Sequence, residues 1–204
     1  MNFAADFYSG HTVIERPAKR KITSLHPTSY KNKSNNEIFK YNHDKDNSIV
    51  TSYSFNNNEL IINKDITCNL GYPYIMKLYN FTFLPDHWDE KTLYYKVCNG
   101  GSYETFNFNF ESINQQKITS HLISSHNILG NTNGKLEIGD KKKSIIFETD
   151  CSKYFPLPYI DYKNFNNTFF LRLSYSSQEV DETFLVKNSN FSSSIKVYGK
   201  QNIS

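Results

Sequence analysis

The chain has 204 residues, enough for one domain with a substantial core, and its 23 Lys and Arg nearly balance its 20 Asp and Glu. The longest uncharged stretches are rich in Asn and Ser, which excludes a helix of the roughly 20 apolar residues that a bilayer requires. The N-terminus lacks the apolar block of a secretory signal, so we expect a protein of the cytoplasm or nucleus of a host cell, or of a virion.

Aromatic residues make up 16% of the chain, with 16 Phe and 15 Tyr against a single Trp. Such a chain buries its rings too well to be disordered, and its abundant Asn favours strands and turns over helices. The three cysteines, Cys68, Cys98 and Cys151, are far apart and form no CxxC pair. We therefore predict three reduced thiols and expect no disulfide framework, metal site or cofactor.

The N-terminal segment differs from the rest of the chain in charge. Residues 16–40 hold seven Lys or Arg against one acid, Glu37, and they show no sustained period of 2 or 3.6 residues. We predict a basic, mostly irregular N-terminal arm over residues 1–48, followed by a domain over residues 49–204.

A cluster of cations lies within this arm, at Arg16, Lys19, Arg20 and Lys21. Cations in an extended segment can neutralise nucleic-acid phosphates or enter the acidic groove of an importin. The cluster is therefore a candidate contact for either partner, and a solvated arm is the alternative.

Short apolar runs separated by turn residues begin near residue 49. Three Asn at 56–58 predict a turn between two strands, and the run 72–84 has apolar residues on both faces, as in a central buried strand. Two glycines, Gly100 and Gly101, predict a hairpin whose second strand, 103–110, alternates Phe with polar residues.

The C-terminal half continues in the same way. A turn at 131–134 and a Lys-rich hairpin tip at 141–143 bracket one predicted strand, and the remaining predicted strands cover residues 118–123, 144–148, 167–175, 182–187 and 193–198. Because one-sided aromatic strands must bury their rings against a second layer, we predict an all-β fold: an antiparallel two-sheet sandwich of jelly-roll or Greek-key type.

The loop after the central strand is the main candidate for ligand binding. It brings together the only Trp and four polar residues: Asp86, His87, Trp88, Asp89 and Glu90. An exposed ring beside carboxylates suits a sugar, because the ring stacks on the sugar face while the acids bind its hydroxyls. The alternative is that Trp88 anchors the loop on the core.

Catalytic signatures are weak. The segment 130–135 resembles a phosphate-binding loop but lacks one residue between its glycines, and no GxGxxG, GxSxG or HExxH occurs. His121 and His126 lie five residues apart, so on one strand they would face opposite ways, and a shared metal would require a turn between them.

Three function classes follow from these observations. The favoured one is a non-catalytic structural subunit of a larger assembly, such as a small jelly-roll viral coat or virion component, which associates with itself or with other subunits and contacts nucleic acid through its arm. The alternative is a carbohydrate- or peptide-binding β-sandwich module that uses Trp88 and surface tyrosines. An enzyme is the third and least favoured, because it requires acids and histidines to converge only in the folded chain.

Overall fold

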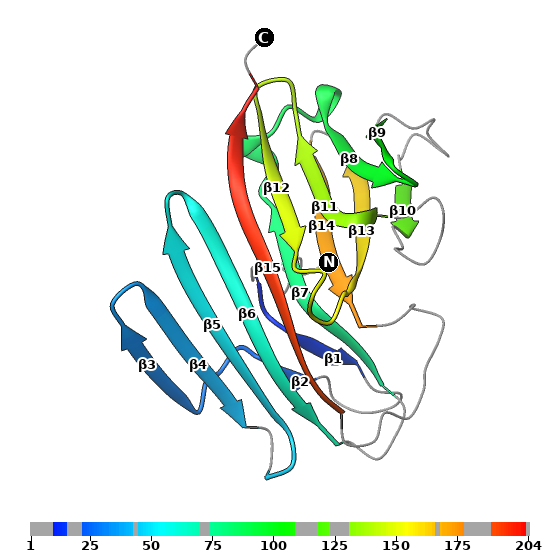
Figure 1. Cartoon of the computed structure of the whole chain (residues 1–204). Coiled ribbons are helices and arrows are strands. Elements are labelled where there is room, and N and C mark those ends of the chain that lie inside the picture. The colour runs from blue at the N-terminus through cyan, green and yellow to red at the C-terminus, as the bar shows by residue number, and fades with distance from the viewer. Residues whose placement is uncertain are drawn as a thin grey trace.

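The computed structural model describes residues 10–15, 22–42, 45–69, 74–108, 118–122, 131–165, 168–177 and 189–202. They form two sheets that pack face to face, and all the strand pairs within them are antiparallel (Figure 1). This confirms the predicted all-β sandwich. In the described part of the chain, no helix is long and apolar enough to cross a membrane.

The smaller sheet has six strands, in the order β10 (Ile118–Leu122), β13 (Leu157–Phe165), β14 (Thr168–Ser176), β7 (Ile75–Phe83), β1 (Val13–Glu15) and β2 (Ile22–Thr23). The larger sheet has nine, in the order β3 (Ser29–Lys33), β4 (Asn36–Asn42), β5 (Ser48–Asn56), β6 (Glu59–Cys68), β15 (Ser189–Gln201), β12 (Lys143–Thr149), β11 (Asn131–Gly139), β8 (Tyr94–Asn99) and β9 (Ser102–Asn107).

Rings fill the space between the sheets. The predicted central strand is β7, which has β14 on one side and β1 on the other and buries Met76, Leu78, Tyr79, Phe81 and Phe83. The neighbouring β14 buries its alternate residues, as its pattern predicts. The sandwich interior is thus built from the aromatic residues that distinguish the composition.

The prediction of a mostly irregular arm is wrong for the described part of residues 1–48. Strands β1 and β2 join the smaller sheet, while β3 and β4 extend the larger one, with Tyr41 opposite Ile49 across the proposed boundary. The sequence did not indicate β3 because this strand is exposed on both faces. Its residues therefore show no alternation of apolar and polar side chains.

The predicted turns at 56–58 and 99–102 are confirmed. Asn57 and Asn58 take positive φ angles of 48° and 64° between β5 and β6, and Gly100 and Gly101 do so between β8 and β9. The strand after the second turn is an outer strand, and its Phe106 is 37% exposed, but Phe108, directly after it, is 1% exposed and belongs to the core as predicted. Phe110 lies outside the described residues.

The predicted turn at 131–134 is instead part of β11. Pairing between β11 and β8 shifts register between Asn131 and Leu136, and Gly134 has a φ of +75°. The turn-like residues therefore form an irregularity within a strand, as in a β-bulge.

Candidate functional site

The loop that carries the predicted site follows β7 as two short 3-10 turns, η2 (Pro85–His87) and η3 (Glu90–Thr92). Proline favours the start of η2 because its φ is already helical, and the Asp89 carboxylate caps η3 by accepting from the Lys91 backbone N–H. Trp88 lies between the two turns, so the local sequence holds its ring at one place beside the end of β7.

The four polar candidates of the loop are not gathered into one site. Asp89 accepts from Lys141 Nζ at 3.1 Å, and this interaction holds the pKa of the Asp89 carboxyl below its usual value. Glu90 accepts a hydrogen bond from the Tyr162 hydroxyl. Asp86 and His87 are exposed. The two carboxylates after Trp88 therefore hold the loop in place.

A buried carboxylate fixes this loop to the opposite sheet. Asp140 is 1% exposed, and its two oxygens accept from the backbone N–H groups of Lys142, Lys143 and Asp89 at 2.7, 2.9 and 2.9 Å. Burial raises the pKa of Asp140, but the three N–H donors outweigh it and leave the pKa lowered. Asp140 thereby joins the Trp88 loop to the β11–β12 hairpin.

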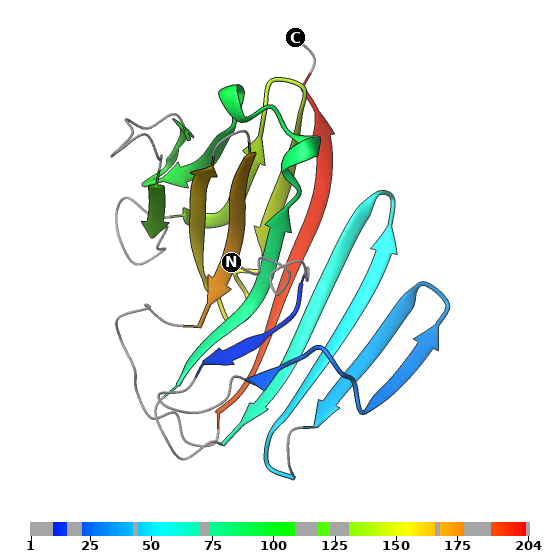
Figure 2. The same ribbon diagram turned by 180° about the vertical axis from the view of Figure 1, so that it is seen from behind.

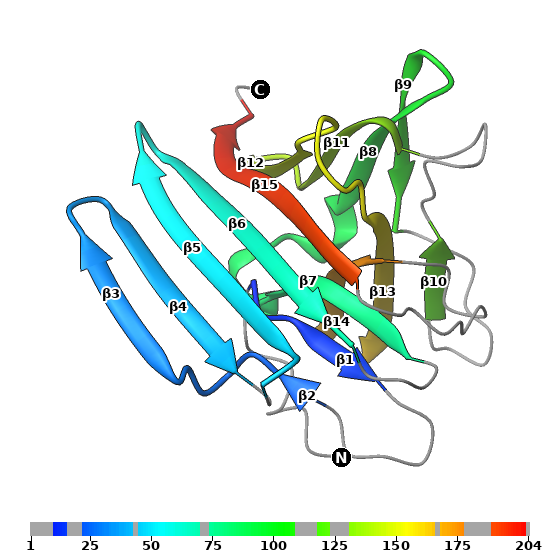
Figure 3. The ribbon, with the colours of Figure 1, turned by 60° about the horizontal axis from the view of Figure 1, so that its bottom comes forward.

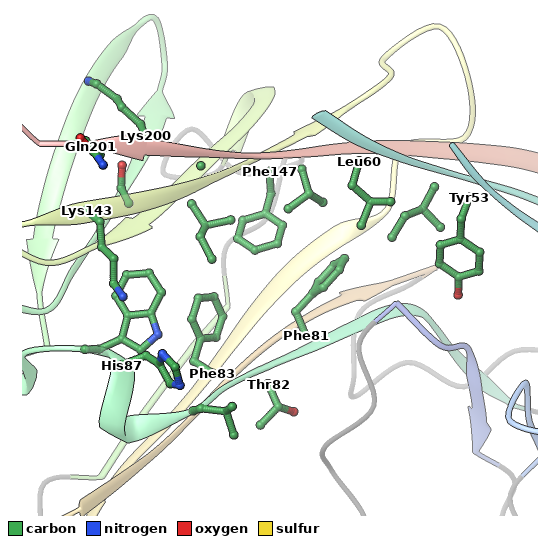
Figure 4. Close-up of a pocket in the computed structure, with 17 residues that line it drawn as sticks. Tyr53, Leu60, Phe81, Thr82, Phe83, His87, Lys143, Phe147, Lys200 and Gln201 are labelled. Carbon is green, nitrogen blue, oxygen red and sulfur yellow. The ribbon is translucent and has the colours of Figure 1, made fainter. Parts of the chain in front are cut away.

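Trp88 and His87 line a pocket of about 660 Å³ between the sheets. Its floor is formed by β7 at Phe81 and Phe83, and its roof by β5, β6, β12 and β15, including Tyr53, Leu60, Ile62, Ile145, Phe147 and Val197. The pocket runs from His87 and Lys143 at one end to Tyr53 at the other (Figure 4).

The packing of Trp88 fits the interpretation of this residue as an anchor of the loop. The indole packs on Phe83 with 5.6 Å between ring centroids, so it anchors the loop, and it also lines the pocket. The pocket forms here because β1 pairs with β7 only at residues 75–77, which leaves the C-terminal half of β7 with no described strand on that side.

A second feature adjoins the pocket. Strands β3, β4 and β5 extend beyond the edge of the smaller sheet, as Figures 1 and 2 show, and Figure 3 shows the same overhang from another side. Because residues paired across antiparallel strands share a face, Tyr30 and Phe39 lie on the same face as Lys64, which is buried between the sheets. This is the inner face of the larger sheet.

Four rings on this inner face form what we call the aromatic strip: Tyr30, Phe39, Tyr53 and Phe55. The ring of Phe39 lies 4.9 Å from that of Tyr30 and 5.7 Å from that of Tyr53, which in turn lines the pocket. Tyr30 is 50% and Phe55 59% exposed, although both face the side of the sheet that is buried elsewhere. The strip leads from the open edge of the sheet to the pocket.

Sequence reasoning missed the strip and most of the pocket. One signal was available: Tyr53 and Phe55 continue the alternation of the buried Ile49 and Thr51 along β5. That alternation indicates one face, but it does not tell whether a second sheet covers it.

The remaining candidates lie elsewhere. Arg16, Lys19, Arg20 and Lys21 fall outside the described residues, as does His126, and the side chain of His121 is not described. Among the residues that the structure describes, no three His, Cys, Asp or Glu side chains are placed to hold a metal ion.

Comparison with known proteins identifies a fold. No family model and no curated protein matches the chain. Among solved structures, it is similar to the Slr1438 protein from Synechocystis sp. PCC 6803, with a TM-score of 0.55 and 12% identity over 86% of this chain. It is also similar to the alpha-galactosidase from Lactobacillus brevis, with a TM-score of 0.57 and 8% identity over 94% of this chain. The chain spans 65% of the first protein and 29% of the second. At these identities the likeness shows the β fold alone.

Proposed function

We propose that this protein is a non-catalytic β-sandwich module that binds a carbohydrate chain on the aromatic strip. The observation that carries the proposal is the position of the strip: Tyr30, Phe39 and Tyr53 lie side by side on the inner face of the larger sheet, and Tyr30 and Phe55 are about half exposed there. Exposed aromatic rings lose water favourably when a flat ligand stacks on them.

The strip has the chemistry of a sugar platform. The C–H groups on one face of a pyranose carry partial positive charge and stack on the negative face of an aromatic ring. Polar groups lie beside the rings: the Tyr30 hydroxyl donates to Glu37 Oε1 at 3.2 Å, and Asn32 is paired with Glu37 across β3 and β4. The Tyr30–Glu37 bond limits rotation of the ring before a ligand arrives, which lowers the entropy cost of binding.

The similar fold of the alpha-galactosidase supports the substrate class in general terms, because the name of that enzyme refers to a sugar. No residue is transferred from it at 8% identity. The engaged carboxylates of Asp89 and Glu90 favour a binding role over hydrolysis, since neither is placed as a member of an acid pair across a ligand.

A glycan array followed by titration calorimetry tests this proposal. Tyr30→Ala and Phe55→Ala should each weaken binding of an array hit by tenfold or more, because both rings are about half exposed and are not needed for the core. Tyr103→Ala is the matched control: Tyr103 is also 50% exposed, but it lies on β9 at the other edge of the same sheet. Equal losses in all three variants, or no array hit, would overturn the proposal.

The structural-subunit prediction remains a second proposal, favoured by the open edge of β3 and by the uncovered strip, which another subunit would bury. This second proposal includes a role as a viral coat or virion component, located in the cytoplasm or nucleus of a host cell. It also includes nucleic-acid contact through Arg16, Lys19, Arg20 and Lys21. Size-exclusion chromatography with light scattering should then show an oligomer that Tyr30→Ala dissociates. A monomer at all micromolar concentrations would count against this role.

A further inference from the structure

The pocket between the sheets is lined mainly by apolar side chains, unlike the aromatic strip with its polar neighbours, and it therefore suits a ligand of another class. We propose that this pocket binds an amphipathic carboxylate, with an apolar chain or ring between the sheets and the carboxylate at the Lys143 end. The site goes beyond the proposed carbohydrate function, and among the residues of the strip it uses only Tyr53.

The interior of the pocket excludes a sugar. Its walls are the side chains of Leu60, Phe81, Phe83, Phe147 and Val197, which offer no hydrogen bonds. A hydroxyl buried there without a partner costs about 1–3 kcal/mol, whereas a buried methylene gains about 0.8 kcal/mol. The volume of about 660 Å³ is that of a small-molecule site.

The Lys143 end of the pocket carries positive charge, and the Coulombic attraction of Asp140 acts on it without forming an ion pair. Lys143 is paired with Gln201 across β12 and β15, and its Nζ lies 4.9 Å from the centroid of the Trp88 ring. Figure 4 shows Lys143 pointing toward His87 at the pocket end, while Lys200 points away from the pocket. No Asp or Glu is found among the described residues that line the pocket.

The acids nearest in the fold already have partners. The oxygens of Asp140 accept from three backbone N–H groups, and Asp89 pairs with Lys141, the neighbour of Lys143 on the hairpin tip. Among the described residues, no ion pair is formed by Lys143, and the face of Trp88 shields one side of its ammonium group. A carboxylate at the pocket end would supply the missing partner through a charge-assisted hydrogen bond.

The test uses dodecanoate and the uncharged dodecan-1-ol, both below the concentrations at which they aggregate. Trp88 is the only Trp of the chain, so its fluorescence reports binding at the pocket end. Lys143→Met keeps an apolar stem against the indole and removes the charge. Lys142→Met is the matched control, because Lys142 is the exposed neighbour on the same hairpin.

We expect dodecanoate to bind the wild type, and Lys143→Met to weaken dodecanoate about tenfold or more while leaving dodecan-1-ol within twofold. Lys142→Met should bind dodecanoate like the wild type. Val197→Phe, checked for folding by circular dichroism, should lose both probes because it fills the pocket.

Absence of dodecanoate binding to the wild type would overturn the proposal, and so would equal losses in Lys143→Met and Lys142→Met. Tyr30→Ala separates the two sites: it should lose the glycan and keep dodecanoate. If dodecanoate fails while the glycan still binds, only the pocket proposal falls.

Discussion

Lys64 Nζ donates a 2.7 Å hydrogen bond to Thr12 Oγ1, and both side chains are completely buried. Thr12 Oγ1 in turn donates to the Leu78 carbonyl at 3.0 Å. This chain of bonds joins β6 of the larger sheet, the segment that leads into β1, and β7 of the smaller sheet. It fixes the N-terminal segment between the two layers by polar contacts.

The buried amine should make stability depend on pH. Burial lowers the pKa of Lys64 to about 7, whereas an unfolded chain has a Lys pKa near 10.4. Between these two pKa values Lys64 carries a proton in the unfolded chain but not in the folded one, so the free energy of unfolding rises with pH from about 7 upward. Below pH 7 the amine is charged in both states, and the folded protein bears the full cost of burying that charge.

Urea unfolding of the wild type and of Lys64→Met at pH 7, 8 and 9 measures this effect. The free energy of unfolding of the wild type, measured relative to that of Lys64→Met, should increase by up to about 1.4 kcal/mol per pH unit. Lys40→Met, at an exposed position of β4, keeps Lys64, so the difference between the wild type and this variant should not change with pH. A difference independent of pH would mean that Lys64 keeps its ordinary pKa.

Asp140→Asn should weaken the attachment of the Trp88 loop. The new amide can still accept from Lys142 and Lys143, but its NH₂ group would face the Asp89 backbone N–H, which Asp140 Oδ2 now accepts at 2.9 Å. We expect a loss of about 1–3 kcal/mol in urea unfolding and a shifted Trp88 emission. Asp150→Asn, in a more exposed turn after β12, should cost less than half as much.

The pH dependence of Asp140 follows from its lowered pKa. Its carboxylate contributes stability above the unfolded Asp pKa of about 3.9, and this contribution is lost as the pH falls through the lower folded value. The wild type should therefore lose its advantage over Asp140→Asn in acid, below about pH 4. An advantage that persists unchanged at pH 2 would contradict the assignment.

Gly134→Ala should destabilise the protein by about 2 kcal/mol or more. Gly134 has a φ of +75°, and a Cβ there would lie 2.5 Å from Thr149 Oγ1 and 2.9 Å from the Thr149 carbonyl oxygen. Gly199→Ala is the control, because a Cβ at that position meets nothing within 4 Å. Thermal unfolding of the two variants side by side measures the difference, and equal melting temperatures would refute the clash.

One thiol should react in the native protein. Cys151 is exposed, whereas Cys68 and Cys98 are 1% and 6% exposed. Partial desolvation of its sulfur, together with the charge of Asp150, raises the pKa of Cys151, so its reaction with Ellman's reagent should be slow at pH 7 and speed up toward pH 9. One equivalent should be modified in the native state and three in urea. Cys151→Ser should abolish the native reaction.

Local features of the fold were predictable from the sequence. The Asn57–Asn58 and Gly100–Gly101 turns need positive φ angles, which these residues adopt at low cost, and the strand patterns around them follow from alternation over neighbouring positions. The Trp88 loop was found for the same reason, since its candidate residues are adjacent. The contacts that join this loop to the β11–β12 hairpin were not, because Asp140 accepts from the Asp89 N–H, 51 residues away, and Asp89 pairs with Lys141.

The composition and alternation of the chain by themselves determined that it forms antiparallel strands whose rings meet between two layers, because side-chain direction in a strand is a local property. Only the tertiary structure decided that β3 and β4 belong to the larger sheet, that Lys143 turns inward beside Trp88, and that Tyr30 and Phe55 remain exposed on the inner face. The physical reason is coverage: whether an apolar face is core or binding surface depends on how far the opposing sheet extends, and strand pairing between distant parts of the chain sets that extent.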